Sequence, residues 1–261
     1  MKYFTCIGGL ALLCLTGCGD DTAPELTQKV LIYEKSNWDG SNKGQIAVYF
    51  EEATKLESFK WHKGNNQATI VRAWMDSSSH TVRRFEALRV DATGNENLSA
   101  VLETQPGGSM DIRLGDHRQE FQNAPSQWHS YDFDFASLGY AFRFLRQGTD
   151  PIVFHILDLD LSESPPVLRD FGNVEMTFQG EENLKGRKLL AYRIDGIGLD
   201  NRGGTIRFDK EEGYLHSFEI QKPDEPGYDS GKLVLQSVTS MNKAEWRNFK
   251  YRQLHADTVS H

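Results

Sequence analysis

The sequence predicts a mainly β (α+β) domain in which antiparallel strands curve around one central apolar helix. Three observations predict this fold. Short apolar or alternating runs recur about every ten residues from Lys29 onward, separated by Gly, Asn, Asp and Ser. One segment near the middle of the chain changes to a helical period, and the strand pattern then resumes.

The first half of the domain is a series of expected strands. Residues 69–75 give the clearest pattern, because Ile70, Arg72 and Trp74 share one face of a strand and the residues between them share the other. Turn residues such as the Asn-Trp-Asp-Gly run at 37–40 separate the strands. The expected strands are 30–33, 45–50, 56–62, 69–75, 82–90, 98–102, 110–114 and 119–122.

Residues 131–148 contain the expected helix. Four apolar residues share one helical face at i, i+3, i+7 and i+10, namely Phe135, Leu138, Phe142 and Leu145. Tyr140 and Phe144 lie on another face, so the helix is apolar on more than one side and should be buried in a concave sheet. Asp134 is the expected N-cap and Gly148 the expected C-terminal stop.

The second half returns to strands. They are expected at 152–159, 174–179, 188–194, 204–208, 215–220 and 233–238. Their expected separators are the turn-like segments 164–166, 180–182, 196–198, 212–213 and 223–227. The tail after Met241 fits two interpretations: Trp246, Phe249 and Leu254 could share a helical face, or Phe249 and Tyr251 could alternate in a last strand.

The N-terminal segment has the layout of an export signal. Lys2 precedes an apolar stretch at 4–15, which is short of the ~20 apolar residues of a membrane-spanning helix. The stretch ends Leu-Thr-Gly-Cys at 15–18, which resembles the lipobox of bacterial lipoproteins. That resemblance implies a signal peptide at 1–17 and a lipidated Cys18.

A polar, acidic run follows, so 18–28 is expected to be the lipidated Cys and a flexible tether, with a single β-rich domain at 29–261. The alternative is an ordinary secretory signal with a chance Cys.

The same resemblance bears on localisation. Gly19, where Asp would favour retention in the inner membrane, implies a cell-envelope protein lipid-anchored in the outer membrane. The net charge of −8 disfavours nucleic acid as a partner and disfavours peripheral binding to anionic lipid. All three cysteines lie at or before Cys18, so the domain has none for a disulfide, a zinc site or a nucleophile.

The order of strands, one apolar helix and more strands is similar to the Lol-type half-barrel carriers of the envelope and to related envelope domains of unknown function. Besides the helix, the stretches that carry the resemblance are 152–158, 174–182, 191–194, 204–209 and 212–215. The resemblance implies a half-barrel wrapped around the helix, with a hydrophobic cleft between them and no catalytic residues. The cavity arginine of the Lol carriers is matched to no position here.

The sequence has no strong motif for a catalytic or metal-binding site. The eight histidines form no His-Glu-x-x-His or other ligand spacing, and there is no Gly-x-Ser-x-Gly. Asp158 and Asp160 share a strand face and could bind calcium or form an acid–base pair, but a solvated strand edge is the expected interpretation. Four tryptophans could form a sugar- or lipid-facing surface or pack in the core, namely Trp61, Trp74, Trp128 and Trp246. We therefore predict no catalytic residue, no metal site, no cofactor and no enzymatic activity.

Two functions are consistent with these patterns. In the first, the lipid-anchored domain binds an apolar ligand or a partner in a cleft lined by Phe135, Leu138, Phe142 and Leu145. In the second, it is a structural or assembly accessory that meets an envelope complex through its sheet edges; a hydrolase is a weaker third. The expected partners are the membrane through the N-terminal lipid, a lipid or other apolar ligand, and an envelope protein, with no nucleic acid. An open cleft around the helix favours the first function and a closed core the second.

Overall fold

The computed structural model describes residues 25–62, 66–131, 135–145, 151–160, 167–221 and 227–255. The export signal, Cys18, most of the tether, Asp134 and Gly148 lie outside the described residues. The predictions made for them therefore stay predictions.

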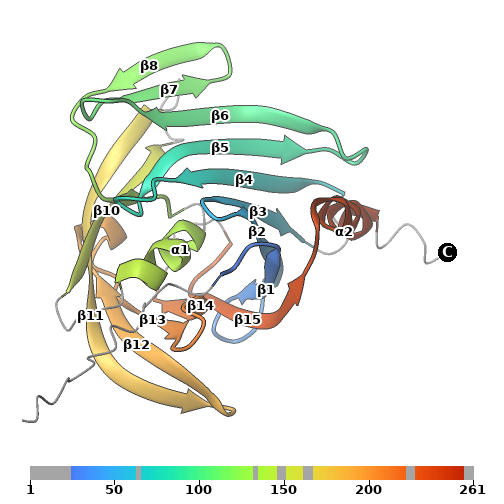
Figure 1. The fold of residues 1–261 in the computed structure, drawn as a ribbon, viewed down its shortest axis with the longest axis vertical. Helices are drawn as coiled ribbons and strands as arrows, with labels where there is room; N and C mark the ends of the chain where they lie inside the picture. The colour runs from blue at the N-terminus through green and yellow to red at the C-terminus, as the bar shows by residue number, and fades with distance from the viewer. Residues whose placement is uncertain are drawn as a thin grey trace, which may run out of the picture.

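In the described part of the chain, one 15-stranded sheet holds the fold together (Figure 1). The first eight strands follow one another as an antiparallel meander. They are β1 (Lys29–Ser36), β2 (Gly44–Glu52), β3 (Lys55–Trp61), β4 (Ala68–Met75), β5 (Val82–Val90), β6 (Glu96–Thr104), β7 (Met110–Leu114) and β8 (His117–Phe121).

The remaining strands form the other half of the sheet. They are β9 (Trp128–His129), β10 (Ile152–Asp160), β11 (Val167–Leu184), β12 (Arg187–Asp195), β13 (Gly204–Asp209), β14 (Leu215–Ile220) and β15 (Gly231–Ser240). The last strand pairs with the first, and Lys29 lies opposite Ser240. The full order is β8-β7-β6-β5-β4-β3-β2-β1-β15-β14-β13-β12-β11-β10-β9, so β8 and β9 are the edges and the described sheet is not closed.

The mainly β prediction is confirmed, but the expected antiparallel pairing is wrong at one pair of strands. Strand β9 runs parallel to β10, with Trp128 opposite His155 and His129 opposite Ile156. The helix α1 (Ala136–Leu145) lies between these two strands in the chain. Parallel neighbours need a crossover connection, and α1 supplies it. A two-residue strand leaves too short a pattern to predict.

Strand β11 is much longer than expected. The sequence predicts a strand at 174–179 and a turn at 180–182, but β11 runs from Val167 to Leu184. Its pairing with β12 shifts register between Phe178 and Gly180, and Gly180 has φ +138°. A bulge with a glycine in this conformation lets a strand continue past residues that otherwise signal a turn.

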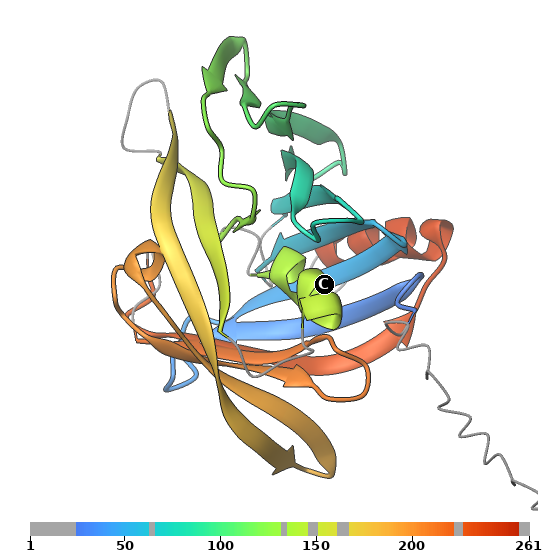
Figure 2. The same ribbon diagram turned by 60° about the vertical axis from the view of Figure 1, so that its left-hand side comes forward.

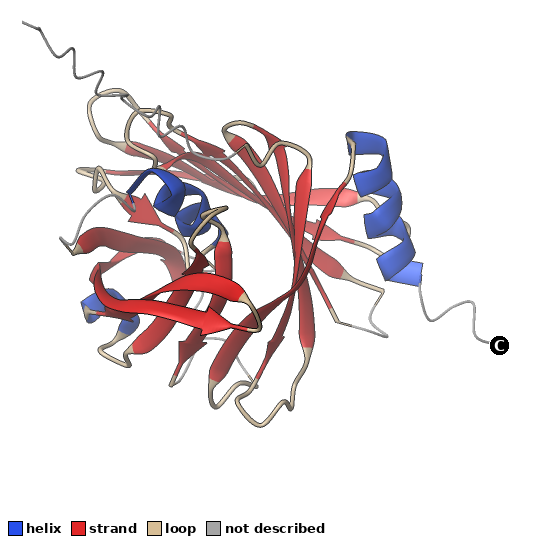
Figure 3. Cartoon of the chain, turned by 60° about the horizontal axis from the view of Figure 1, so that its bottom comes forward, coloured by secondary structure: helices blue, strands red, loops and turns tan. Residues whose placement is uncertain are grey.

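The two α-helices of the described residues lie on opposite faces of the sheet (Figures 1 and 3). Strand β4 shows this directly: Val71 belongs to the buried cluster that contains α1, and Ile70 belongs to the cluster that contains the helix α2 (Lys243–His255). The tail is therefore helical, and the alternative of a last strand is wrong. Neither helix is long and apolar enough to cross a membrane, as far as the described residues go.

The helix α1 is held from several directions. Figure 2 shows it beside strands of both halves of the sheet. Ala136 and Gly139 face side chains of β1 and β2, while Phe142 contacts β12 and β13. A short 3-10 helix, η1 (Ile197–Leu199), connects β12 to β13, where the sequence predicts a hairpin turn.

Candidate functional site

The four residues predicted to line a cleft lie at α1, but they do not share its face as expected. Leu138 and Phe142 are inside the helix and fully buried. Phe135 comes just before it, with φ +55°, and its carbonyl accepts the first helical hydrogen bond, from Gly139 N at 2.8 Å. Leu145 is the last helical residue, and its side chain lies outside the described part.

Phe135 is fixed by aromatic packing. Its ring lies 5.2 Å from Phe218 and 6.3 Å from Phe154, in edge-to-face arrangements with both. A positive φ is uncommon for a bulky side chain and costs about 1–3 kcal/mol. The surrounding rings hold this conformation, so Phe135 joins the start of α1 to β10 and β14.

At the other end of α1, Phe142 stacks face to face on Phe208 of β13, with ring centroids 3.7 Å apart. The edge of Tyr192 completes the contact, at 5.2 Å from Phe142. Tyr192 also lies 5.3 Å from Phe178 on β11. Phe142 is therefore packed by protein rings and not exposed to a cleft.

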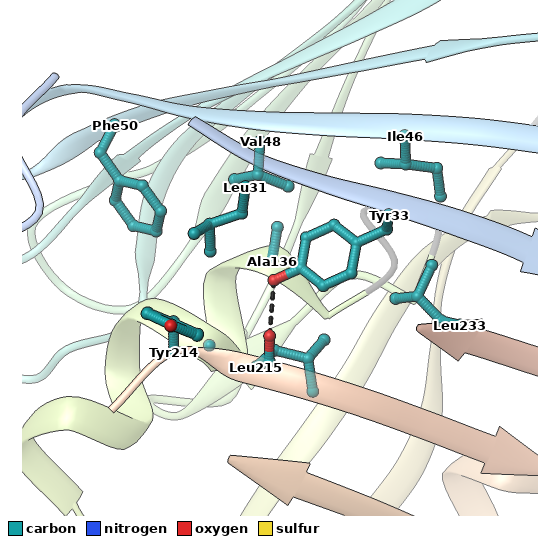
Figure 4. A pocket seen from close by; sticks show the side chains of 10 residues that line it. Leu31, Tyr33, Ile46, Val48, Phe50, Ala136, Tyr214, Leu215 and Leu233 are labelled. Carbon is teal, nitrogen blue, oxygen red and sulfur yellow. Dashed lines mark hydrogen bonds between the residues drawn. The ribbon is translucent and has the colours of Figure 1, made fainter. Parts of the chain in front are cut away.

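Between α1 and β1, β2, β14 and β15 there is a small apolar cavity (Figure 4). Its volume is about 10 Å³, which is room for about one water molecule. Its lining residues are Leu31, Tyr33, Ile46, Val48, Phe50, Ala136, Gly139, Tyr214, Leu215 and Leu233. Tyr33 donates a hydrogen bond to the carbonyl of Leu215 at 2.7 Å, and burial raises the pKa of its phenol well above the usual value. The contact between α1 and these strands is a closed core.

A buried polar pair secures the start of α1. His129 Nδ1 and Ser137 Oγ lie 2.9 Å apart, and both residues are fully buried. Burial lowers the pKa of His129 to about 3, so the imidazole is neutral at neutral pH. Next to it, the Thr81 hydroxyl donates to the Trp128 carbonyl at 2.8 Å and accepts from the Trp128 amide at 2.9 Å. These bonds join β9 to α1 and to the residue just before β5, and the burial of the His129–Ser137 pair keeps it from bulk solvent.

The other carboxylates and histidines considered for catalysis or metal binding do not come together at one site. Asp158 lies on β10, and the side chain of Asp160 is outside the described part. His155 on the same strand pairs with Asp170 of β11 at 2.8 Å. Among the residues that the structure describes, no group of three or more His, Cys, Asp or Glu could hold a metal ion.

Three of the four tryptophans considered for a binding surface are core residues. Trp61 and Trp246 belong to the cluster under α2, and Trp128 to the cluster around α1. Trp74 is partly exposed, with the Lys55 ammonium 5.2 Å and the Arg84 guanidinium 5.6 Å from its ring. The tryptophans therefore form no continuous stacking surface.

A charged cluster that the sequence did not reveal holds α2 to the sheet. The buried carboxylate of Glu57 on β3 accepts hydrogen bonds from Trp246 Nε1 at 2.7 Å, Lys250 Nζ at 2.6 Å and Arg72 Nε at 2.6 Å. Lys250 and Arg72 also bind Glu96 on β6. The pKa of Arg72 is raised, because its two carboxylate partners outweigh the effect of burial. No local pattern links Glu57 to a helix almost two hundred residues later.

The β10 side of the sheet has an incomplete edge. Strand β9 pairs only with His155 and Ile156, so residues 152–154 of β10 have no strand neighbour on that side within the described residues. We call residues 152–154 the β10 edge. Val153 on it is 48% exposed. Ile197 and Phe171, also exposed, lie nearby: Ile197 packs against Gly172, whose β-carbon, if it had one, would be 2.9 Å from Ile197 Cγ2.

Comparisons with known proteins give little guidance. No protein-family model matches the chain, and no curated protein matches it. Among the solved structures it is similar to that of a Bacteroides fragilis protein inferred to be exported and described as having a YmcC-like fold. The two chains are 11% identical, the match covers 84% of this chain and 98% of the other, and the TM-score is 0.27. A TM-score this low supports no argument on fold or function.

Proposed function

We propose that this protein is an envelope lipoprotein, anchored in the outer membrane through Cys18, that works by binding a partner protein and holds no small ligand in its core. The observation that carries the proposal is the closed packing of α1. An acyl chain needs a cavity of hundreds of Å³, and the space beside Gly139 is about 10 Å³. On this proposal the strands and α1 form a half-barrel whose cleft is filled by its own side chains.

The β10 edge is the proposed place of contact. Unpaired amide and carbonyl groups of an edge strand can pair with an extended segment of another chain, and neighbouring apolar side chains add affinity. Residues 152–154 carry no charged side chain, whereas β8 on the opposite edge carries His117, Arg118 and Glu120 in five residues. Charged side chains discourage strand addition. The contrast supports β10 as the edge that accepts a partner.

No catalytic role is part of the proposal. The His129–Ser137 pair has the spacing of a base and a nucleophile, but both residues are fully buried. We interpret the pair as a structural contact that holds the start of α1.

Two measurements test the anchor and the ligand. The variant Cys18→Ala should move the protein out of the membrane fraction, and continued membrane association would contradict lipid anchoring. Native mass spectrometry of the mature domain, purified under mild conditions from its own envelope, should show the protein mass alone. A bound lipid would overturn the proposal in favour of a carrier.

A photo-crosslinking amino acid at position 153 tests the contact itself. We expect it to join a partner protein in whole cells. The matched control is position 98 on β6, where Leu98 is 44% exposed against 48% for Val153. Equal crosslinking at the two positions, or none at position 153, would contradict a specific contact at the β10 edge.

A further inference from the structure

The helix α2 is basic, although the chain as a whole is acidic. It contains Lys243, Arg247, Lys250 and Arg252 and a single acidic residue, Glu245, in a protein of net charge −8. Glu245 Oε2 accepts a hydrogen bond from the Asn242 backbone, and Asn242 Oδ1 accepts from the Glu245 backbone. This reciprocal capping uses the acidic residue to start the helix.

The buried and exposed faces of α2 have different compositions. Trp246, Phe249 and Leu254 pack on the sheet. The opposite face exposes residues at the helical spacing i, i+3, i+4, i+7 and i+8, namely Ala244, Arg247, Asn248, Tyr251 and Arg252. We call these five residues the outer face of α2.

The arginines of this face are available for a partner. Both lysines of the helix are engaged, Lys243 with Glu51 and Lys250 with Glu57 and Glu96. Neither Arg247 nor Arg252 has a carboxylate partner among the described residues. Tyr251 lies between them on the helix surface and is 55% exposed. An exposed aromatic ring flanked by two arginines matches the composition of surfaces that rest in a membrane interface.

The first described residues of the chain lie close to the start of α2. The Met241 amide, two residues before the helix, donates to the Gln28 carbonyl at 2.8 Å. Seven residue steps separate Cys18 from Glu25, the first described residue, and they span at most about 25 Å. A lipid on Cys18 would therefore hold this corner of the domain within that distance of the bilayer.

We propose that the outer face of α2 rests on anionic phospholipid headgroups of the membrane that holds Cys18, and the inference rests on the lipid anchor proposed above. Arg247 and Arg252 bind phosphate groups, and Tyr251 enters the headgroup layer. An arginine near an anionic surface makes a small favourable contribution to binding. Two arginines would not hold an acidic domain on a membrane alone, but they orient a domain that is already tethered there.

This orientation has a consequence for the rest of the molecule. Figures 1 and 3 show α2 at one side of the fold, and Figure 1 shows β10 and β11 at the other. With α2 on the membrane, strand β10 lies on the side of the fold remote from the bilayer. A partner in the envelope would approach from that side.

The test uses a tethered domain with a single label. Residues 1–18 are replaced by a histidine tag that binds a nickel-chelating lipid, so the domain has no native cysteine and no dependence on lipidation. A fluorophore is attached to N248C, or in the control to D116C in the β7–β8 turn. Both proteins are placed on vesicles of phosphatidylcholine and phosphatidylglycerol at 3:1, which carry a headgroup-level quencher, and on vesicles without phosphatidylglycerol.

We expect the label at position 248 to be quenched at least twofold more on the phosphatidylglycerol vesicles than on the neutral ones, and the label at 116 to be unchanged. The double variant R247E/R252E should abolish the difference. The matched reversal R113E/R118E, at exposed arginines of β7 and β8, should preserve it. Equal quenching at 248 and 116, or quenching that survives R247E/R252E, would overturn the inference. Because the chelating lipid replaces Cys18, these outcomes are independent of the Cys18→Ala fractionation.

Discussion

The rings of Phe142 and Phe208 are parallel within 7° and their centroids are 3.7 Å apart. Both rings are fully buried, so this contact closes the space between α1 and β13. We expect Phe142→Ala to lower the free energy of unfolding by about 3–5 kcal/mol, as for other buried phenylalanines. Urea unfolding measures this decrease in the free energy of unfolding.

The control is Phe144→Ala on the same helix, where the ring is 37% exposed and the free energy of unfolding should fall clearly less. Equal losses would mean that Phe142 faces solvent or an open cleft.

Replacing Gly139 by alanine should stabilise the fold, whereas Phe142→Ala should destabilise it. It lies inside α1 and lines the small cavity, and a β-carbon there would be 3.4 Å from Leu215 Cβ, an ordinary contact. Alanine is favoured over glycine inside a helix by about 1 kcal/mol. Gly139→Ala should therefore raise the melting temperature by a few degrees in a thermal scan. The contrasting variant is Gly198→Ala, whose β-carbon would be 2.6 Å from the Gly172 carbonyl oxygen and should destabilise. A destabilised Gly139→Ala would contradict the described packing.

The stability of the fold should depend on pH through His129. Its pKa is lowered by burial to about 3, against about 6.5 in an unfolded chain. The folded-state pKa is the lower one, so this stability is fully present above about pH 6.5 and decreases as the pH falls toward 3. Between pH 7 and pH 5 the contribution of His129 to the free energy of unfolding should fall by about 2 kcal/mol.

The variant His129→Gln removes this titration. Urea unfolding at pH 7 and pH 5 should show a smaller acid loss than in the unmodified protein, whatever the variant's stability at pH 7. His155→Gln, at a partly exposed histidine, is the control and should keep the full acid loss. An unchanged loss in His129→Gln would show that His129 is not buried as a neutral group.

Among the charged residues that attach α2 to the sheet, Glu57 is the one whose substitution should destabilise the fold most. Glu57→Gln keeps the size of the side chain but removes the charge that Lys250 and Arg72 share. Removing the charge of Glu57 leaves the two positive charges beside it without their buried counter-charge. We therefore expect the free energy of unfolding, measured in urea, to fall by about 3 kcal/mol. Glu103→Gln is the control, because the Arg84–Glu103 pair is much more exposed than Glu57, and exposed pairs contribute about 0–1 kcal/mol. Similar effects of the two changes would contradict a central role for Glu57.

Local signals in the sequence predicted most of the elements. Strand β4 and the helix α1 have clear periods, and both lie within a residue or two of the expected bounds. The errors arose where tertiary contacts outweigh local signals. Gly180 has the composition of a turn but forms a bulge, because β12 continues to pair with β11 beyond it. The left-handed backbone of Phe135 depends on rings from β10 and β14.

The candidate site was less predictable than the fold. The apolar character of α1 indicated burial, but periodicity does not distinguish a core from an open cleft. That difference depends on Phe208 and Leu215, which are far from α1 in the chain. The β10 edge was hidden for a similar reason, since it exists only because β9 is two residues long.

The pairing of β1 with β15 has a consequence for how the chain acquires its structure. Strand β1 leads the domain, yet one of its two neighbours is the last strand before α2. If the chain is exported N-terminus first, as proposed above, that side of β1 stays unpaired until nearly every residue has emerged. Contacts between such distant segments form slowly, and an unpaired strand is prone to aggregate in the meantime. A chaperone that covers β1 during this interval would therefore raise the yield of folded protein, and loss of β15 would leave two half-sheets without their common junction.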